Sequence, residues 1–223
     1  MRYLPALFLR RFAVGVILLA APLLLGQAAP PAPAVPAVPA KTPPVCAGEP
    51  LVDAATLIPD AVVEMKYATA DNMFKRPMYA EATCWLRKSV AERLARAAAI
   101  LREQGYRLVL WDCYRPPAVQ REMFRLHPAP GEVAHPKVGS NHSRGSAVDV
   151  SLADREGKPL AMPTGFDAFV PAAWREAADL PPEAKANRER LKAAMRQAGF
   201  SGIRREWWHY NAKGAEKWGL CGQ

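Results

Sequence analysis

One stretch of the sequence carries signals for both the fold and a functional site: Ser140-Asn-His-Ser-Arg-Gly-Ser-Ala-Val-Asp-Val-Ser-Leu152. Beyond Gly145, apolar residues alternate with small or polar ones, which predicts a strand that places Asp149 on the face opposite to its core-facing residues. His142 and Asp149 are an odd number of residues apart, so an uninterrupted strand would put them on opposite faces. We therefore expect a turn at Gly145 that folds His142 back towards Asp149.

A second stretch near the C-terminus, Glu206-Trp-Trp-His209, adds a carboxylate and another histidine. Two histidines (His142 and His209) and Asp149 can fill three positions around a zinc ion and leave the fourth open for water, as in catalytic zinc sites. Glu206 is then left over as a base for that water. This pattern indicates a zinc peptidase. Glu206 and His209 are three residues apart, so a bulge or a strand end is needed for both to reach one metal.

Each of these residues also has a simpler interpretation. Asp149 can be a buried hydrogen-bonding residue, and His142 a loop histidine. Arg115 ends a predicted strand, where it can reach a ligand, but it can also be a surface arginine paired with Asp112 or a neighbour. Tyr67 can line a site or simply pack in the core.

The N-terminal segment differs in composition from the rest of the chain. Residues 1–28 have the basic, apolar and small-residue regions of a secretory signal peptide. The apolar run Phe12–Leu25 is shorter than the roughly 20 residues that span a bilayer, which argues against an uncleaved anchor. Residues 29–45 are rich in proline and alanine and predict an extended linker. We expect residues 46–223 to form one domain that is exported, periplasmic or secreted, and not stably inserted in the membrane after signal cleavage.

The cysteine content bears on the cellular compartment, and the net charge bears on the class of partner. Four cysteines fit an oxidising compartment, and their spacing matches no cysteine-based zinc motif. Sequence alone leaves three pairings open; our hypothesis is Cys84–Cys113 and Cys46–Cys221, the second tying the two ends of the domain together. The formal net charge is +9, but no dense basic run or basic–aromatic stripe accompanies it, which argues against a nucleic-acid partner.

Hydrophobic periodicity, caps and breakers predict the remaining elements. A capping box of Ser89 and Glu92 is expected to start a core-facing helix that ends at Gly105. The other predicted elements are strands at Val62–Tyr67, Tyr106–Tyr114 and Ile203–Tyr210, and helices at Ala118–Leu126 and Pro182–Ala198.

Five motifs, taken together and in order, resemble the D-alanyl-D-alanine dipeptidases of the VanX type. They span essentially all of Leu51 to Tyr210, and they are Lys66–Asn72, Trp111–Pro116, Ser140–Asp149, Phe166-Asp167 and Glu206–Tyr210. The resemblance implies an α+β fold of a single domain, in which helices flank a mainly antiparallel sheet that carries the zinc site.

The resemblance also implies a reaction, the zinc-dependent hydrolysis of the dipeptide D-Ala-D-Ala to two D-alanines with one Zn²⁺ per chain. The zinc ligands would be His142, Asp149 and His209. Glu206 would be the catalytic base and Arg115 the stabiliser of the transition state. Asp167 and Ser140 would lie near the ends of the bound dipeptide, with Tyr67 beside them.

Two other functions fit parts of this pattern. A D,D-carboxypeptidase or other peptidoglycan peptidase on the same fold would use the same metal and base in an open cleft that admits a cell-wall stem peptide. A zinc-bearing binding module without activity, as in hedgehog domains, is more distant. Glu206 and Arg115 argue against that module, because a structural zinc site needs neither.

Overall fold

The computed structural model describes residues 43–222, which lie within one compact unit of the chain. The predicted signal peptide, and the linker up to residue 42, lie outside the described residues. Among residues 43–222, no helix has the length and apolar character that crossing a membrane requires.

The fold is α+β, as predicted, and its centre is a five-stranded sheet in the order β2-β4-β5-β7-β6. β2 runs parallel to β4, and all other neighbours are antiparallel. A separate antiparallel pair consists of β1 and β3. The strands are β1 (Leu51–Asp53), β2 (Val62–Val63), β3 (Trp85–Arg87), β4 (Arg107–Asp112), β5 (Ala147–Ala153), β6 (Phe200–Gly202) and β7 (His209–Ala212).

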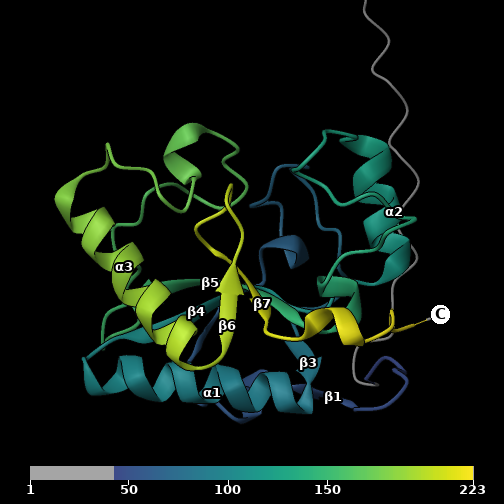
Figure 1. The fold of residues 1–223 in the computed structure, drawn as a ribbon, viewed down its shortest axis with the longest axis horizontal. Coiled ribbons are helices and arrows are strands. Elements are labelled where there is room, and N and C mark those ends of the chain that lie inside the picture. Colours follow the sequence, from purple (N-terminus) through teal and green to yellow (C-terminus); the bar gives the residue numbers. More distant parts are fainter. Residues whose placement is uncertain (1–42, 223) are drawn as a thin grey trace, which may run out of the picture. The chain divides into compact units, whose positions relative to one another are not determined.

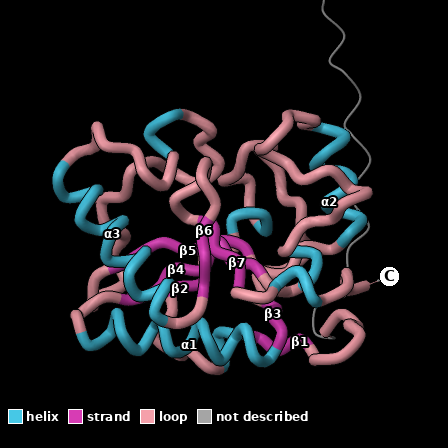
Figure 2. Tube along the Cα trace, viewed as in Figure 1, coloured by secondary structure: helices cyan, strands magenta, loops and turns pink. Residues whose placement is uncertain are grey.

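Three α-helices accompany the sheet: α1 (Lys88–Glu103), α2 (Pro117–Leu126) and α3 (Pro182–Gln197). α1 runs along one side of the sheet, and α3 packs against α1, β5 and β6 (Figure 1). Most of the long loops lie on the other side of the strands from α1, together with α2 (Figure 2). The functional residues are therefore expected on the loop side, because loops can vary while the sheet holds them in place.

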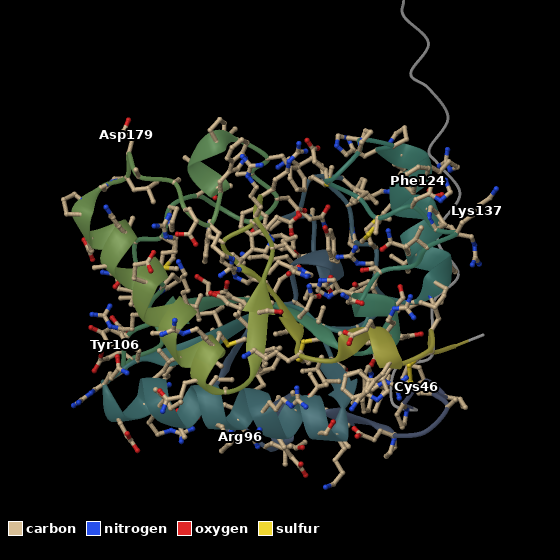
Figure 3. The ribbon with its side chains drawn as sticks, in the orientation of Figure 1. Cys46, Arg96, Tyr106, Phe124, Lys137 and Asp179 are labelled. Atoms are coloured by element: carbon tan, nitrogen blue, oxygen red, sulfur yellow. A yellow bond between two sulfur atoms is a disulfide. The ribbon has the colours of Figure 1, made fainter. Side chains whose placement is uncertain are left out.

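The core forms between the sheet and α1. One face of α1 is buried from Val90 to Leu101 at helical spacing, whereas Arg96, labelled in Figure 3, lies on its exposed face. Every residue of β5 is at most 4% exposed, so both faces of this central strand are covered. Val148, Val150 and Leu152 belong to the core cluster, as the alternation predicts. Asp149 lies on the opposite face and is only 3% exposed, so this ionisable side chain is almost fully shielded from solvent.

The predicted capping box of Ser89 and Glu92 is wrong. α1 begins at Lys88 directly after β3, so Ser89 lies inside the first turn, and its hydroxyl is buried without a partner among the described residues. The Glu49 carboxylate accepts a hydrogen bond from the Ser89 N–H at 3.0 Å and does the capping instead. A residue 40 positions away thus replaces the local cap, which local sequence cannot reveal.

The predicted strand Ile203–Tyr210 is also wrong over most of its length. β6 ends at Gly202 and β7 begins at His209, so residues 203–208 form the connection of a hairpin. Trp207 and Trp208 favour strands by propensity, but here they are buried loop residues that fill the core. On a continuous strand, Glu206 and His209 would face opposite sides. Because Glu206 instead lies in the loop and His209 is the first residue of β7, both can face the same point.

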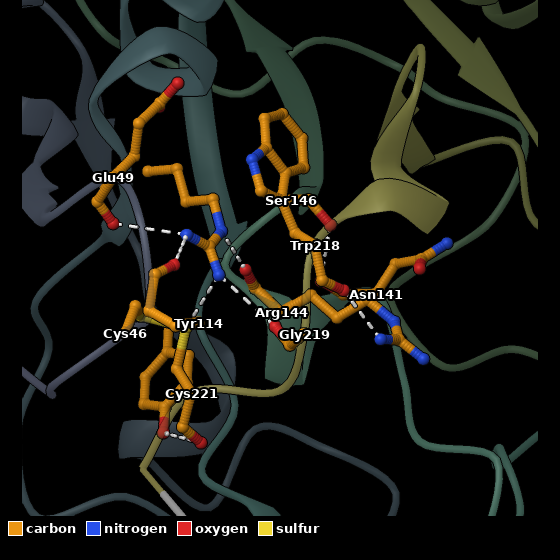
Figure 4. The surroundings of a disulfide bond; sticks show 11 residues. Cys46, Glu49, Tyr114, Asn141, Arg144, Ser146, Trp218, Gly219 and Cys221 are labelled. Carbon is orange, nitrogen blue, oxygen red and sulfur yellow. Dashed lines mark hydrogen bonds between the residues drawn. A yellow bond between two sulfur atoms is a disulfide. The ribbon is translucent and has the colours of Figure 1, made fainter.

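Both disulfides of the hypothesis are present: Cys84–Cys113 and Cys46–Cys221. The second joins residues 175 positions apart and fixes the chain end against the start of the domain (Figure 4). Around it, the Tyr114 hydroxyl donates to the Cys221 carbonyl at 3.2 Å. Arg87 donates to the carbonyls of Ala47, Glu49, Arg144 and Gly219.

Candidate active site

A cavity of about 620 Å³ opens on the loop side of the sheet. The eight residues expected to carry the site come from five motifs that are far apart in the sequence, yet all of them line this cavity. They are Tyr67, Arg115, Ser140, His142, Asp149, Asp167, Glu206 and His209.

Three of these residues converge on one point. The distance from His142 Nε2 to His209 Nδ1 is 3.1 Å, and Asp149 Oδ1 lies 3.4 Å from the first nitrogen and 3.0 Å from the second. Asp149 and His209 are register partners on β5 and β7, so the sheet itself sets their spacing. All three ligand atoms lie within 4.8 Å of one another, and all three residues are buried.

The turn predicted at Gly145 brings His142 to this point. His142–Arg144 form a 3-10 turn that ends at Gly145, whose φ of 66° is left-handed. A Cβ at Gly145 would lie 2.6 Å from the Leu51 side chain, so both the backbone conformation and the available space require glycine here.

The second ring nitrogen of each histidine has its own acceptor. His142 Nδ1 lies 2.7 Å from the Cys113 carbonyl, and His209 Nε2 lies 2.9 Å from Asn211 Oδ1. Because these acceptors take the ring protons, the lone pairs of His142 Nε2 and His209 Nδ1 face each other and the Asp149 carboxylate. In this arrangement the three ligand atoms form a cluster of acceptors that could hold a metal ion.

The electrostatics favour a positive charge at this point. Burial favours the neutral form of Asp149, but when the histidines carry a proton, their charge and hydrogen bonds outweigh burial and hold the pKa of this carboxyl below its usual value. A metal ion would supply that positive charge when the two ring nitrogens are unprotonated. Two imidazole nitrogens and one ionised carboxylate oxygen form a donor set that fits zinc and leaves one position open. These residues therefore fit a catalytic metal better than a structural one.

Glu206 stands beside this group, in the loop between β6 and β7. Its Oε2 lies 3.9 Å from His209 Nδ1, and the residue is 9% exposed. Burial raises the pKa of Glu206 to about 7. A carboxyl that titrates near neutral pH can both accept and donate a proton under working conditions.

Arg115 follows β4 and faces the same cavity. Nε and Nη2 donate to Asp112 Oδ2 at 3.3 and 2.7 Å, and Nη1 donates to Gln120 Oε1 at 2.9 Å. Arg115 therefore forms an ion pair with Asp112, but this pair is buried and does not lie at the surface. Burial works against the charged form, and the neighbouring Asp112 charge more than offsets it, so the pKa of Arg115 lies above its usual value. A guanidinium has five N–H groups, so this anchoring leaves some of them free to donate into the cavity.

Asp167 lies elsewhere on the cavity wall, in a left-handed backbone conformation with φ of 56°. It accepts hydrogen bonds from the Tyr67 hydroxyl at 3.1 Å and from the Met73 N–H at 3.2 Å. Burial raises the pKa of Asp167 to about 7. Tyr67 is only 4% exposed, so it both packs in the core and lines the cavity.

Ser140 and Asn211 complete the surroundings of the two histidines. Ser140 Oγ accepts from the His142 N–H at 3.2 Å, so its own O–H remains able to donate. Asn211 was missed in the sequence, although it lies two residues after His209 and thus on the same face of β7. Its Oδ1 also accepts from Asn141 Nδ2 at 2.9 Å, so two segments fix its orientation.

A buried His–Asp–His group with a carboxyl beside it and an arginine facing the same cavity defines a metal-dependent hydrolase as the class of protein. Residues 48–218 match the Peptidase_M15 family, described as D-ala-D-ala dipeptidase. The chain belongs to this family of metallopeptidases, and it is an enzyme.

Two relatives named D-alanyl-D-alanine dipeptidase agree with that assignment. A D-alanyl-D-alanine dipeptidase of Escherichia coli K12 is 40% identical over 170 residues, which are 76% of this chain and 88% of the relative. One of Streptomyces coelicolor is 32% identical and covers 67% of this chain and 85% of the relative. Among solved structures, the vancomycin-resistance D,D-pentapeptidase VanY in complex with Zn(II) has a TM-score of 0.37 and 18% identity, over 60% of this chain and 78% of that chain.

Proposed function

We propose that the chain hydrolyses D-Ala-D-Ala to two D-alanines at a zinc ion held by His142, Asp149 and His209. The observation that carries the proposal is the convergence of these three acceptors in a cavity that Glu206 also lines. A zinc ion bound there would lower the pKa of water to about 7 and polarise the peptide carbonyl.

Glu206 would act as general base and then as general acid. Its carboxylate takes a proton from the attacking water and passes that proton to the amine of the leaving D-alanine. One group can do both because its pKa lies near neutrality.

Arg115 would stabilise the negative charge that develops on the carbonyl oxygen. Its bonds to Asp112 and Gln120 hold the guanidinium in place before the substrate arrives, so no reorganisation is needed during the reaction.

The two ends of the dipeptide would be recognised by charge and hydrogen bonds. Asp167, whose pKa lies at about 7, would ionise against the ammonium group, and Ser140 would supply a hydroxyl donor for the carboxylate. The cavity of about 620 Å³ lies in the range of about 300–1,000 Å³ that holds drug-sized ligands. Selectivity for a dipeptide would therefore come from these two end contacts and not from the cavity volume, because a longer peptide leaves them unpaired.

The test of the proposal is D-alanine release from two substrates by zinc-loaded protein. Release from free D-Ala-D-Ala, and not from a muramyl pentapeptide with the same two terminal residues, supports the dipeptidase. Release from the pentapeptide instead means a D,D-carboxypeptidase on the same site. Release from neither, with zinc bound, means a binding module.

We also propose that the protein works outside the cytoplasm. The two disulfides support this location, because such bonds persist in oxidising compartments. Fractionation of the native host, with mass mapping of non-reduced peptides, checks it; a cytoplasmic protein with four free thiols would contradict it.

Asn211→Ala is expected to weaken zinc binding by about 10- to 100-fold, because it removes the acceptor that orients His209. Chelator competition measures the affinity without any need for turnover. The matched control is Asn187→Ala, since Asn187 is a buried asparagine that donates to the Ala161 carbonyl and does not contact either histidine. Unchanged affinity in the Asn211 variant would show that this hydrogen bond does not support the metal.

Asp167→Asn is expected to abolish most turnover at neutral pH and yet to stabilise the metal-free protein there. The pKa of Asp167 is raised from 3.8 to about 7, so the folded state binds more protons than the unfolded state between these values, and stability falls as pH rises across this window. Asparagine does not ionise, so the variant does not lose this stability. Its free energy of unfolding should exceed that of the wild-type protein by about 1.4 kcal/mol for each unit by which burial raises the pKa of Asp167.

Denaturant unfolding from pH 4 to 8 measures the Asp167 effect, with the exposed Asp179→Asn as control. The stability difference between Asp167→Asn and the wild-type protein should grow up to about pH 7 and then level off. A constant difference would show that Asp167 is not held in its neutral form by burial.

A further inference from the structure

Arg175 is a buried cation that the mechanism above does not use. It is 8% exposed, and no carboxylate among residues 43–222 forms an ion pair with it. Its Nε donates to the Ile203 carbonyl at 3.1 Å. Its Nη2 donates to the carbonyl of His209 at 2.6 Å, and at longer distances to those of Glu206 and Trp207.

A buried charge is costly unless polar groups compensate it. Here the compensation comes from backbone carbonyls and from the ring face of Tyr210, 4.4 Å from the guanidinium carbon. All the carbonyls belong to the stretch from Ile203 to His209, which is the hairpin connection and the first residue of β7. The position of this stretch is therefore tied to the guanidinium.

The surrounding backbone strengthens the same link. The Arg175 N–H donates to the Arg204 carbonyl, and the Trp207 N–H donates to the Ala173 carbonyl, both at 2.9 Å. At Gly202 an added Cβ would lie 1.7 Å from the Arg175 guanidinium carbon, so only glycine allows the side chain to cross there.

We propose that Arg175 is a positioning residue that fixes the Glu206 carboxyl relative to His209, a role that rests on the proposed function. Glu206 lies outside the β-ladder, so strand pairing does not set its place. Arg175 contacts the carbonyls of both residues and so sets the spacing between base and metal ligand. A misplacement of about 1 Å in a reacting group lowers the rate by about 100-fold.

Arg175→Lys tests this role, because lysine keeps the charge but has no planar fork to span the carbonyls. We expect kcat for D-Ala-D-Ala to fall by about 100-fold, with KM within about threefold and one zinc per chain retained. The amides of residues 203–208 should exchange hydrogen faster than in the wild-type protein.

The matched control is Arg188→Lys. Arg188 is 2% exposed and also donates to carbonyls, those of Trp174 and Ala177, but it does not contact the hairpin connection. Wild-type kcat and exchange in this variant support the proposal. An equal loss of kcat in both variants would overturn it, and so would wild-type kcat or unchanged exchange in Arg175→Lys.

Two further measurements distinguish a wrong role for Arg175 from a variant that does not fold and from failure of the proposed function. If Arg175→Lys does not fold, Gly202→Ala displaces the same guanidinium and should give the same kcat loss; wild-type kcat in that variant would overturn the role. If the wild-type protein does not cleave D-Ala-D-Ala, the proposed function fails. The exchange of residues 203–208 then still decides whether Arg175 holds this segment.

Discussion

Replacing Glu206 with glutamine is expected to lower kcat for D-Ala-D-Ala by about 100- to 10,000-fold while zinc stays bound. Glutamine matches the shape of the glutamate side chain but cannot carry a proton between water and the leaving amine. The variant should fold, because burial disfavours the ionised carboxyl that the substitution removes. Steady-state kinetics with metal analysis on the same preparation measure both effects.

Glu132→Gln is the matched control for this prediction. Glu132 also lines the cavity, but its carboxylate pairs with His127 at 2.6 Å instead of standing beside the ligand group. We expect this variant to keep kcat. Near-normal turnover in Glu206→Gln would refute Glu206 as the base.

The second large effect is expected for Arg115→Ala, which should lower both turnover and stability. Loss of a donor to the developing oxyanion typically lowers kcat by about 100- to 1,000-fold. Asp112, 0% exposed, would lose its ion-pair partner and keep only the hydrogen bonds from the Tyr79 hydroxyl and the Cys113 N–H. Breaking a buried pair in this way costs about 3–5 kcal/mol. Kinetics and denaturant unfolding measure the two effects separately.

Two other variants separate catalysis from folding at Arg115. Arg115→Lys keeps a cation beside Asp112 but lacks the planar fork, so stability should recover in part and kcat should not. Arg102→Ala breaks a partly exposed pair with Asp60 and should cost at most about 1 kcal/mol without a change in kcat. Wild-type kcat in Arg115→Lys would contradict the assigned role.

Short sequence patterns were enough to predict those site residues whose positions depend on neighbours close in the sequence. The alternation after Gly145 places Asp149 correctly, and the glycine provides the turn that returns His142 to it. The helices at α1, α2 and α3 follow from periodicity and breakers in the same way. In each case, the residues that decide the structure are within a few positions of one another.

Long-range contacts account for what the sequence did not reveal. Glu49 caps α1 from 40 residues away, and Arg175 donates to three carbonyls of the hairpin connection 203–208, whose composition favours a strand. A surface pair of Arg115 with Asp112 or a neighbour was one of two interpretations from the sequence, and the burial of the pair depends on tertiary packing. Asn211 could have been predicted from the sequence as a neighbour of the site, because its spacing of two residues from His209 places it on the same strand face.

Zinc titration tests the central claim most directly. Metal-stripped protein is titrated with Zn²⁺ while D-alanine release from D-Ala-D-Ala is followed, alongside His209→Ala as a variant without one ligand. Activity that rises in proportion and saturates at one zinc per chain, and stays absent in the variant, is the predicted result. Activity without metal, or full restoration in His209→Ala, would contradict a catalytic zinc at His142, Asp149 and His209.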